Sequence, residues 1–176
     1  MKTKPAFDID LKNYCVHPMS LEDIAAIQEV YDKCLDYMLL VDGHAADPNA
    51  VVEEFQAVPP GKTNDDKLVF GITESQKGIV GFLDILRWYP DNTTWWIDTL
   101  LIIPESRSKS LGEKVIEGFV DYVRASGAQS IMLGVVEENV RAYRFWSKMG
   151  FEFVRETEPR QFGNKMQRVK IMRRNL

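Results

Sequence analysis

Cysteine and histidine are scarce in this sequence, which has two of each. Cys15 and Cys34 lack the C-x-x-C spacing of zinc and redox sites, and neither lies near a pair of histidines that would complete a metal site. We therefore expect free thiols, as proteins of a reducing compartment have, and no metal centre. With only His17 and His44 available, a serine–histidine nucleophile has little support.

Long apolar runs are absent as well. No stretch approaches the roughly 20 apolar residues of a membrane span, and the first ten residues lack the apolar core of a signal peptide. The chain has 176 residues, of which 45% are hydrophobic, and this is the size of one domain with a single core. We expect one domain over residues 1–176, located in the cytoplasm and not in a membrane.

Charge is spread unevenly along the chain. Residues 1–60 hold four lysines and eleven acidic residues, a balance of −7, whereas residues 104–176 hold fourteen basic and nine acidic residues, a balance of +5. This gradient favours a polyanionic ligand for the C-terminal part and a cationic one for the N-terminal part, although chance scatter of surface charge would also produce it. Nucleic-acid binders concentrate basic charge far more strongly, so we expect no nucleic-acid partner.

Hydrophobic periodicity predicts alternating strands and helices. The predicted strands cover residues 14–17, 67–73, 79–88, 95–103, 130–136, 151–156 and 167–173. The predicted helices cover residues 20–38, 48–57, 110–125 and 139–149. The strands between 67 and 103 form an antiparallel meander. The helix that follows then leads to a strand parallel to the last of them, because a strand–helix–strand crossover returns in the same direction.

A basic loop leads from the predicted strand over 95–103 into the helix over 110–125. Such a loop aims several unpaired N–H groups and the positive end of the helix dipole at one point, which suits a phosphate or diphosphate. Arg107 and Lys109 add positive charge, and the small residues Ser108, Ser110 and Gly112 let the backbone approach a ligand closely. Many helices begin after a basic loop, so this pattern alone does not identify the ligand.

Two motifs carry a resemblance to a known family. Arg107-x-x-Ser110-x-Gly112 resembles the R/Q-x-x-G-x-G/A loop of the GNAT superfamily of N-acetyltransferases. Residues 139–151, NVRAYRFWSKMGF, resemble the N-x-x-A-x-x-F-Y-x-x-x-G-F helix and turn of the same family. The motifs stand in the family's order and separation, and the resemblance covers nearly the whole chain.

The resemblance implies an α/β (α+β) fold: a mixed, mostly antiparallel sheet with a splayed parallel strand pair, flanked by helices. It implies acetyl transfer from acetyl-coenzyme A to the amine of a small, cationic molecule or a peptide. Main-chain atoms at Ile102 and Ile103, with Asn139, would hold the pantetheine arm, although strand packing and a helix cap are their ordinary roles. The diphosphate would lie against the loop residues Arg107, Ser108, Lys109, Ser110, Leu111 and Gly112.

Two residues depart from the family pattern. Ser110 stands where glycine is preferred, which a negative φ at this position would accommodate. Trp146 stands where many members carry a tyrosine that protonates the leaving thiolate, and indole cannot do so. Because a thiol has a pKa near about 8.5, the thiolate still leaves without a general acid, only more slowly. Tyr143, one turn earlier, or water is the candidate proton donor, and packing is the alternative role for Tyr143.

The acceptor requires a base, because an amine with a pKa near about 10.4 is protonated at pH 7. Asp84 and Asp98 are the candidates, since each is an acid inside an otherwise apolar strand. Strand alternation places Asp98 on the face of Trp96 and Ile102. A solvated edge position or a bond to a neighbouring strand is the alternative for either carboxylate, and a chain of water molecules is the alternative carrier of the proton.

Two rival functions follow from other features. A GNAT-like module that binds acyl-coenzyme A as a sensor, without turnover, is favoured by Trp146. A nucleotide triphosphatase is rejected: Pro60-Gly61-Lys62-Thr63 resembles the end of a P-loop, but Gln56 stands where that motif requires glycine. No residue decides the oligomeric state, so a homodimer stays open.

Overall fold

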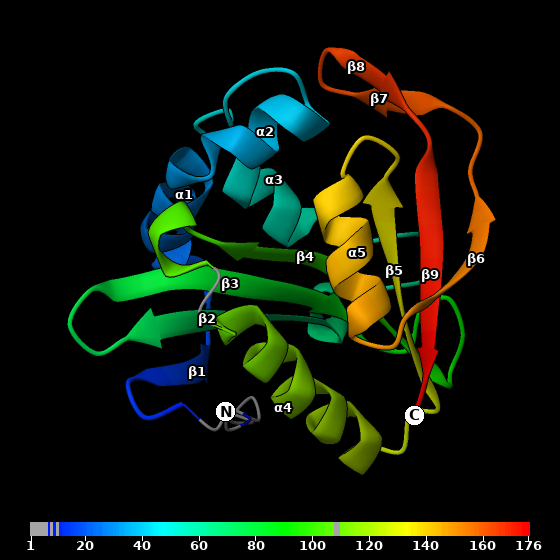
Figure 1. Ribbon diagram of the computed structural model, residues 1–176, viewed down its shortest axis with the longest axis horizontal. Coiled ribbons are helices and arrows are strands. Elements are labelled where there is room, and N and C mark those ends of the chain that lie inside the picture. Colours follow the sequence, from blue (N-terminus) through cyan, green and yellow to red (C-terminus); the bar gives the residue numbers. More distant parts are fainter. Residues whose placement is uncertain (1–6, 8, 10, 108–109) are drawn as a thin grey trace.

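The computed structural model describes residues 7, 9, 11–107 and 110–176. One sheet has the strand order β1-β2-β3-β4-β5-β9-β6 (Figure 1). Its strands are β1 (Tyr14–Pro18), β2 (Lys67–Glu74), β3 (Gly78–Leu86), β4 (Thr94–Ile102), β5 (Ser130–Val136), β6 (Glu152–Glu156) and β9 (Val169–Asn175). The α-helices are α1 (Ile24–Lys33), α2 (Leu35–Val41), α3 (Ala50–Gln56), α4 (Leu111–Ala125) and α5 (Val140–Lys148). A separate hairpin consists of β7 (Arg160–Phe162) and β8 (Lys165–Gln167).

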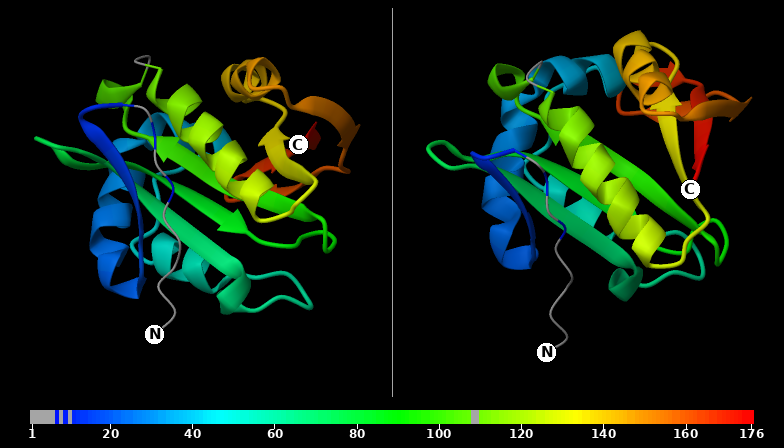
Figure 2. Two further views of the ribbon diagram at one scale, coloured as in Figure 1. Left: turned by 90° about the horizontal axis from the view of Figure 1, so that it is seen from below. Right: turned by 60° about the horizontal axis from the view of Figure 1, so that its bottom comes forward.

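Strands β1 to β4 form the antiparallel meander, and β4 and β5 form a parallel pair. Strand β9 lies antiparallel between β5 and β6. Helices α1 and α3 cover one face of the meander and α4 covers the opposite face (Figure 2). The predicted fold class, a mixed and mostly antiparallel sheet with one parallel pair and flanking helices, is confirmed.

Helix α4 is fixed to the sheet by its apolar stripe. Its predicted inward residues are all buried: Val115, Ile116, Phe119, Val120 and Val123. The ring centres of Phe119 and of Trp95 in β4 lie 6.3 Å apart. Because this packing is dense, the start of α4 has a fixed position relative to β4.

The parallel pair splays. Strand β4 pairs with β5 only over 94–97 and 130–133, although β4 continues to Ile102 and β5 to Val136. A β-bulge falls at the same place, because Ile85 pairs with Ile97 while Asp84 pairs with Thr99, so Asp98 is the extra residue. Simple alternation was therefore wrong here. Asp98 points towards Lys67 of β2, whereas the side chain of Ile102 reaches the start of α4.

The predicted helix over 20–38 is broken. A 3₁₀ turn (Leu21–Asp23) and α1 precede a break at Cys34, whose ψ of 38° is not helical, and α2 begins after it. The break turns α2 towards β4, and residues of α2 line the site described below. The hairpin of β7 and β8 was not predicted. Within the described ranges, no helix has the length and apolar character needed to cross a membrane.

Candidate functional site

A cavity of about 590 Å³ opens where β4 and β5 part. Its walls come from α2, β4, the start of α4, β5 and α5, with further residues from the β7 hairpin and β9. Strand residues without a neighbouring strand leave main-chain donors and acceptors free for a ligand. The cavity thus combines an open strand edge with the N-terminus of a long helix.

Most of the predicted site residues meet in this cavity. Those that line it are Asp98, Ile102, Arg107, Ser110, Leu111, Gly112 and Asn139. The predictions for Ser108 and Lys109 fall outside the described residues. Ile103 and Tyr143 are not among the lining residues.

The backbone explains the position of Ile103. Its N–H donates to Val80 O in β3 at 2.9 Å, so it faces the neighbouring strand and not the open edge. Backbone groups alternate between the two edges of a strand, so the residues whose main chain faces the open edge are Leu100 and Ile102. The ring of Tyr143 contacts the ammonium of Lys170, which lies 5.0 Å from the ring centre.

Among the described residues, the first N–H groups of α4 have no acceptor within the helix. The first bond of the helix runs from Lys114 N–H to Ser110 O at 3.0 Å, so the N–H groups of Leu111, Gly112 and Glu113 precede the helical ladder. All three residues line the cavity. A negative φ would have accommodated serine at this position, but Ser110 has φ 59° and ψ 7°, the left-handed conformation that glycine adopts without strain. Ser110 therefore has a backbone conformation in which glycine would be favoured.

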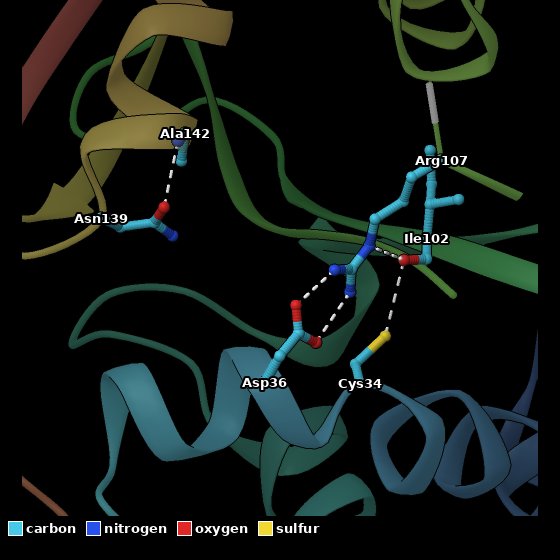
Figure 3. Close-up of polar contacts among 6 residues, drawn as sticks. All are labelled: Cys34, Asp36, Ile102, Arg107, Asn139 and Ala142. Atoms are coloured by element: carbon cyan, nitrogen blue, oxygen red, sulfur yellow. Dashed lines mark hydrogen bonds and ion pairs between the residues drawn. The ribbon is translucent and has the colours of Figure 1, made fainter. Parts of the chain in front are cut away.

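Arg107 does not point into solvent (Figure 3). Its Nε donates to Ile102 O at 2.7 Å, its Nη2 donates to Asp36 Oδ1 at 3.1 Å, and its Nη1 contacts the second oxygen of Asp36. The guanidinium group holds the pKa of the Asp36 carboxyl below its usual value through these hydrogen bonds. Cys34 also donates weakly to Ile102 O, with a distance of 3.6 Å from its Sγ. Arg107 thus joins α2 to the end of β4.

Helix α5 contributes a cap and an aromatic wall. The Oδ1 of Asn139 accepts from Ala142 N–H at 3.0 Å, which is the ordinary capping role of asparagine (Figure 3). Trp146 is buried and packs edge-on against Phe145 and Phe151, with ring centres 5.0 and 5.2 Å away. Asn139, Phe145 and Trp146 all line the cavity.

The two candidate bases lie in different places. Asp98 lines the cavity with a side chain 42% exposed, and partial burial raises its pKa although Lys67 lowers it. Asp84 is 1% exposed and lies 3.0 Å from the ammonium of Lys67. Burial raises the pKa of Asp84 well above its usual value. Only Asp98 can meet a substrate in the cavity.

Sequence reasoning missed Glu54. Its Oε1 accepts from Thr99 Oγ1 at 3.1 Å, directly beside Asp98 in the chain. Burial raises its pKa, and so does the charge of Asp98, whereas Lys67 lowers it. The sequence has no signal that separates Glu54 from Glu53, because both are acids in one short helix and only the packing of α3 on β4 distinguishes them.

Comparison with known proteins agrees with this geometry. The sequence profile of the acetyltransferase (GNAT) family matches residues 26–151. No curated protein matches the sequence. Among solved structures, an acetyltransferase from Thermus thermophilus superposes with a TM-score of 0.75 and 22% identity, covering 93% of this chain and 97% of that one.

Two further solved structures share the fold. The spermidine N-acetyltransferase from Vibrio cholerae in complex with CoA and spermine has a TM-score of 0.73 and 17% identity over 94% of this chain and 96% of that one. A GCN5-related N-acetyltransferase from Kribbella flavida has a TM-score of 0.69 and 16% identity over 94% and 99%. At these identities the likeness establishes a common fold.

Proposed function

The chain belongs to the acetyltransferase (GNAT) family, and from this premise we propose that it transfers an acetyl group from acetyl-coenzyme A to the amine of a small, cationic acceptor. One observation carries the proposal. The N–H groups of α4 that precede the helical ladder and the carboxylate of Asp98 open into one cavity, at the place where β4 leaves β5. One bound acetyl-coenzyme A molecule would therefore reach both the N–H donors for its diphosphate and the base for the acceptor amine.

Acetyl-coenzyme A is the co-substrate of this family, and the residues present suit it. The N–H groups of Leu111, Gly112 and Glu113 would receive the diphosphate. At the open edge of β4, the main chain of Leu100 and the N–H of Ile102 would pair with the amide groups of the pantetheine arm, since Ile102 O already accepts from Arg107. Arg107 contributes by positioning the end of β4, because its donors already engage Asp36 and Ile102 O.

Asp98 would take the proton of the acceptor. Acetyl-coenzyme A supplies a thioester carbonyl carbon that a neutral amine attacks, and a carboxylate with a raised pKa is a stronger base than an ordinary aspartate. Trp146 cannot protonate the departing thiolate, and Tyr143 is not among the cavity residues, so we assign that proton to solvent. The thiolate is stable enough near neutral pH for this route.

The cavity residues around Asp98 favour a cationic acceptor. Asp98 provides negative charge, and the aromatic side chains of Tyr37 and Trp96 line the same cavity, where they offer faces to an ammonium group. Burial and the neighbouring acids raise the pKa of Tyr37, so its phenol stays neutral at physiological pH. The spermidine N-acetyltransferase among the structural neighbours supports amines of this class.

The proposal extends to organisation and location. We propose that residues 1–176 act as a single domain and that the protein works in the cytoplasm, where the free thiols of Cys15 and Cys34 would stay reduced. Neither nucleic acid nor a membrane has a place in the proposed reaction. A homodimer remains compatible with it.

The test is thiol release from acetyl-coenzyme A with a panel of polyamines, aminoglycosides, amino acids and peptide N-termini. We expect one class of amines to release thiol and to gain an acetyl group by mass spectrometry. Saturable binding of the co-substrate without turnover on any amine would instead support the second candidate, an acyl-coenzyme A sensor, which Trp146 favours.

A further inference from the structure

Glu54 forms part of an acid cluster at the cavity wall, in which Glu54 is half-buried, Asp84 is buried and Asp98 is exposed. Ligand oxygens of Glu54, Asp84 and Asp98 all lie within 4.8 Å of one another. Carboxylates at such separations do not all ionise readily, because each negative charge raises the pKa of its neighbours. The three side chains come from α3, β3 and β4, so the fold gathers them and local sequence does not.

Lys67 supplies the balancing charge. Its ammonium lies 3.0 Å from Asp84 Oδ2 and 3.8 Å from Asp98 Oδ2, and it donates to the main-chain oxygens of Glu54 and Ala57. The ammonium group of Lys67 thus lies beside the carboxylates, where a bound cation would otherwise lie. Since Asp84 is the nearest and most buried carboxylate, it is the natural ion-pair partner of Lys67. Glu54 and Asp98 lie beside this ion pair, with Asp98 at the longer distance from the ammonium and Glu54 bonded to the Thr99 hydroxyl.

We propose that Glu54 and Asp98 act as a carboxyl pair in acetyl transfer, in which Asp98 takes a proton from the acceptor ammonium and Glu54 holds that proton behind it. This inference rests on the proposed function. Glu54 acts through Asp98 and is a positioning residue, because Asp98 lines the cavity and Glu54 is not among its lining residues. The Lys67–Asp84 ion pair holds the carboxyl pair in place.

The reaction balances in atoms and charge. The acceptor ammonium gives one proton to Asp98, and the freed nitrogen forms a bond to the thioester carbonyl carbon while the carbon–sulfur bond breaks. The second proton of that nitrogen neutralises the thiolate through solvent. The proton held by the carboxyl pair passes to water, which returns the pair to its starting state.

The groups around Glu54 affect its pKa, so a pH–rate profile can distinguish a role in proton transfer from a purely structural role. The groups that face it are Lys67 from β2, Asp84 from β3, Asp98 and Thr99 from β4, Tyr31 from α1 and Tyr37 from α2. The Thr99 hydroxyl donates to the ionised carboxylate and so lowers the pKa of Glu54. Removing this hydroxyl should therefore move the acid limb of a pH–rate profile to higher pH.

The experiment compares pH–rate profiles of the full chain with acetyl-coenzyme A and the best acceptor of the amine panel. We expect Glu54→Gln to lower kcat at least tenfold and to move the acid limb to lower pH, because the loss of a neighbouring negative charge lowers the pKa of Asp98, while its affinity for coenzyme A by calorimetry stays within twofold. Glu53→Gln, at the exposed neighbouring position, is the matched control and should behave as wild type. Thr99→Val should shift the acid limb to higher pH.

Two outcomes would decide against the inference. Glu54→Gln with the kcat and profile of Glu53→Gln overturns it, and so does a Thr99→Val profile that stays in place or moves to lower pH. If Glu54→Gln does not fold, the Thr99→Val profile alone decides. A wild-type chain that transfers no acetyl group to any amine refutes the proposed function itself, which separates the two failures.

Discussion

Asp36 of α2 and Arg107 of the loop before α4 form a two-point ion pair, and both residues line the cavity. The same guanidinium group donates to the carbonyl of Ile102 at 2.7 Å. The Arg107 side chain therefore joins α2, the end of β4 and the loop that leads to α4. Its arrangement explains why a basic residue at 107 need not contact a phosphate to serve the site.

Asp36→Asn should weaken this junction. The Asp36 side chain is 56% exposed, so we expect a loss of roughly 1 kcal/mol or less in the free energy of unfolding at pH 7. Because Arg107 lowers the pKa of Asp36 in the folded state, the stabilisation is present above the unfolded-state pKa and is lost as pH falls through the folded-state pKa.

Denaturant unfolding between pH 7 and pH 3 measures this effect. The difference between wild type and Asp36→Asn should shrink towards the acid end. Asp121→Asn is the control, because Asp121 pairs with Arg124 inside one exposed helical turn and joins no two elements. Equal losses in both variants would show that the junction adds nothing beyond a surface pair.

Ser110→Gly should stabilise the protein. A non-glycine residue in the left-handed region costs on the order of 1 kcal/mol, and glycine removes that cost while adding some freedom to the unfolded chain. We expect a net gain of about 0.5 kcal/mol, seen as a higher Tm. Ser110→Ala keeps the Cβ atom and should show no gain, so a similar rise in both variants would contradict the strain assignment.

Trp146→Tyr should restore the proton donor that many family members carry. General acid catalysis is typically worth about 10²–10⁴, and a tyrosine placed in a pocket shaped for tryptophan should recover part of it. We expect kcat to rise by about tenfold in the thiol-release assay. Trp146→Phe makes nearly the same change in volume without the hydroxyl, and equal rates for the two variants would rule out a proton from position 146.

Asp98 sets the acid side of the pH dependence. Its carboxylate accepts a proton only when ionised, and burial raises its pKa, so kcat/KM should begin to fall at a pH above that expected for an exposed aspartate. Asp98→Asn should lower kcat far more than it lowers the affinity for coenzyme A. Equal activity of wild type and variant across pH 6 to 9 would remove Asp98 from the reaction.

Much of the fold could be predicted from local patterns. The strands of the meander and the inward stripe of α4 follow from periods of 2 and 3.6 residues, which depend on neighbours in sequence. The break at Cys34 could not be predicted, because the apolar stripe continues through it and the contact made there, from Cys34 Sγ to Ile102 O of β4, joins residues far apart in sequence. The bulge at Asp98 likewise depends on the register with β3, which one strand's sequence does not encode.

The candidate site also has one part that local sequence predicts and another that depends on tertiary contacts. The loop at Arg107 and the cap at Asn139 are local motifs that a sequence can indicate, and both residues line the cavity. Glu54 and Lys67 come together with Asp98 through tertiary contacts alone, and the role of Arg107 as a junction depends on Asp36, 71 residues away. Contacts of this range leave no trace in a single sequence.

The most direct test of the account is a calorimetric titration of the purified chain with acetyl-coenzyme A, alongside Gly112→Trp. A Cβ at position 112 would lie 3.4 Å from Phe145 and 3.5 Å from Ile102, so alanine fits there but an indole would fill the space before α4. We predict saturable binding for wild type and Gly112→Ala and none for Gly112→Trp. No heat and no saturation for wild type at millimolar ligand would contradict the account.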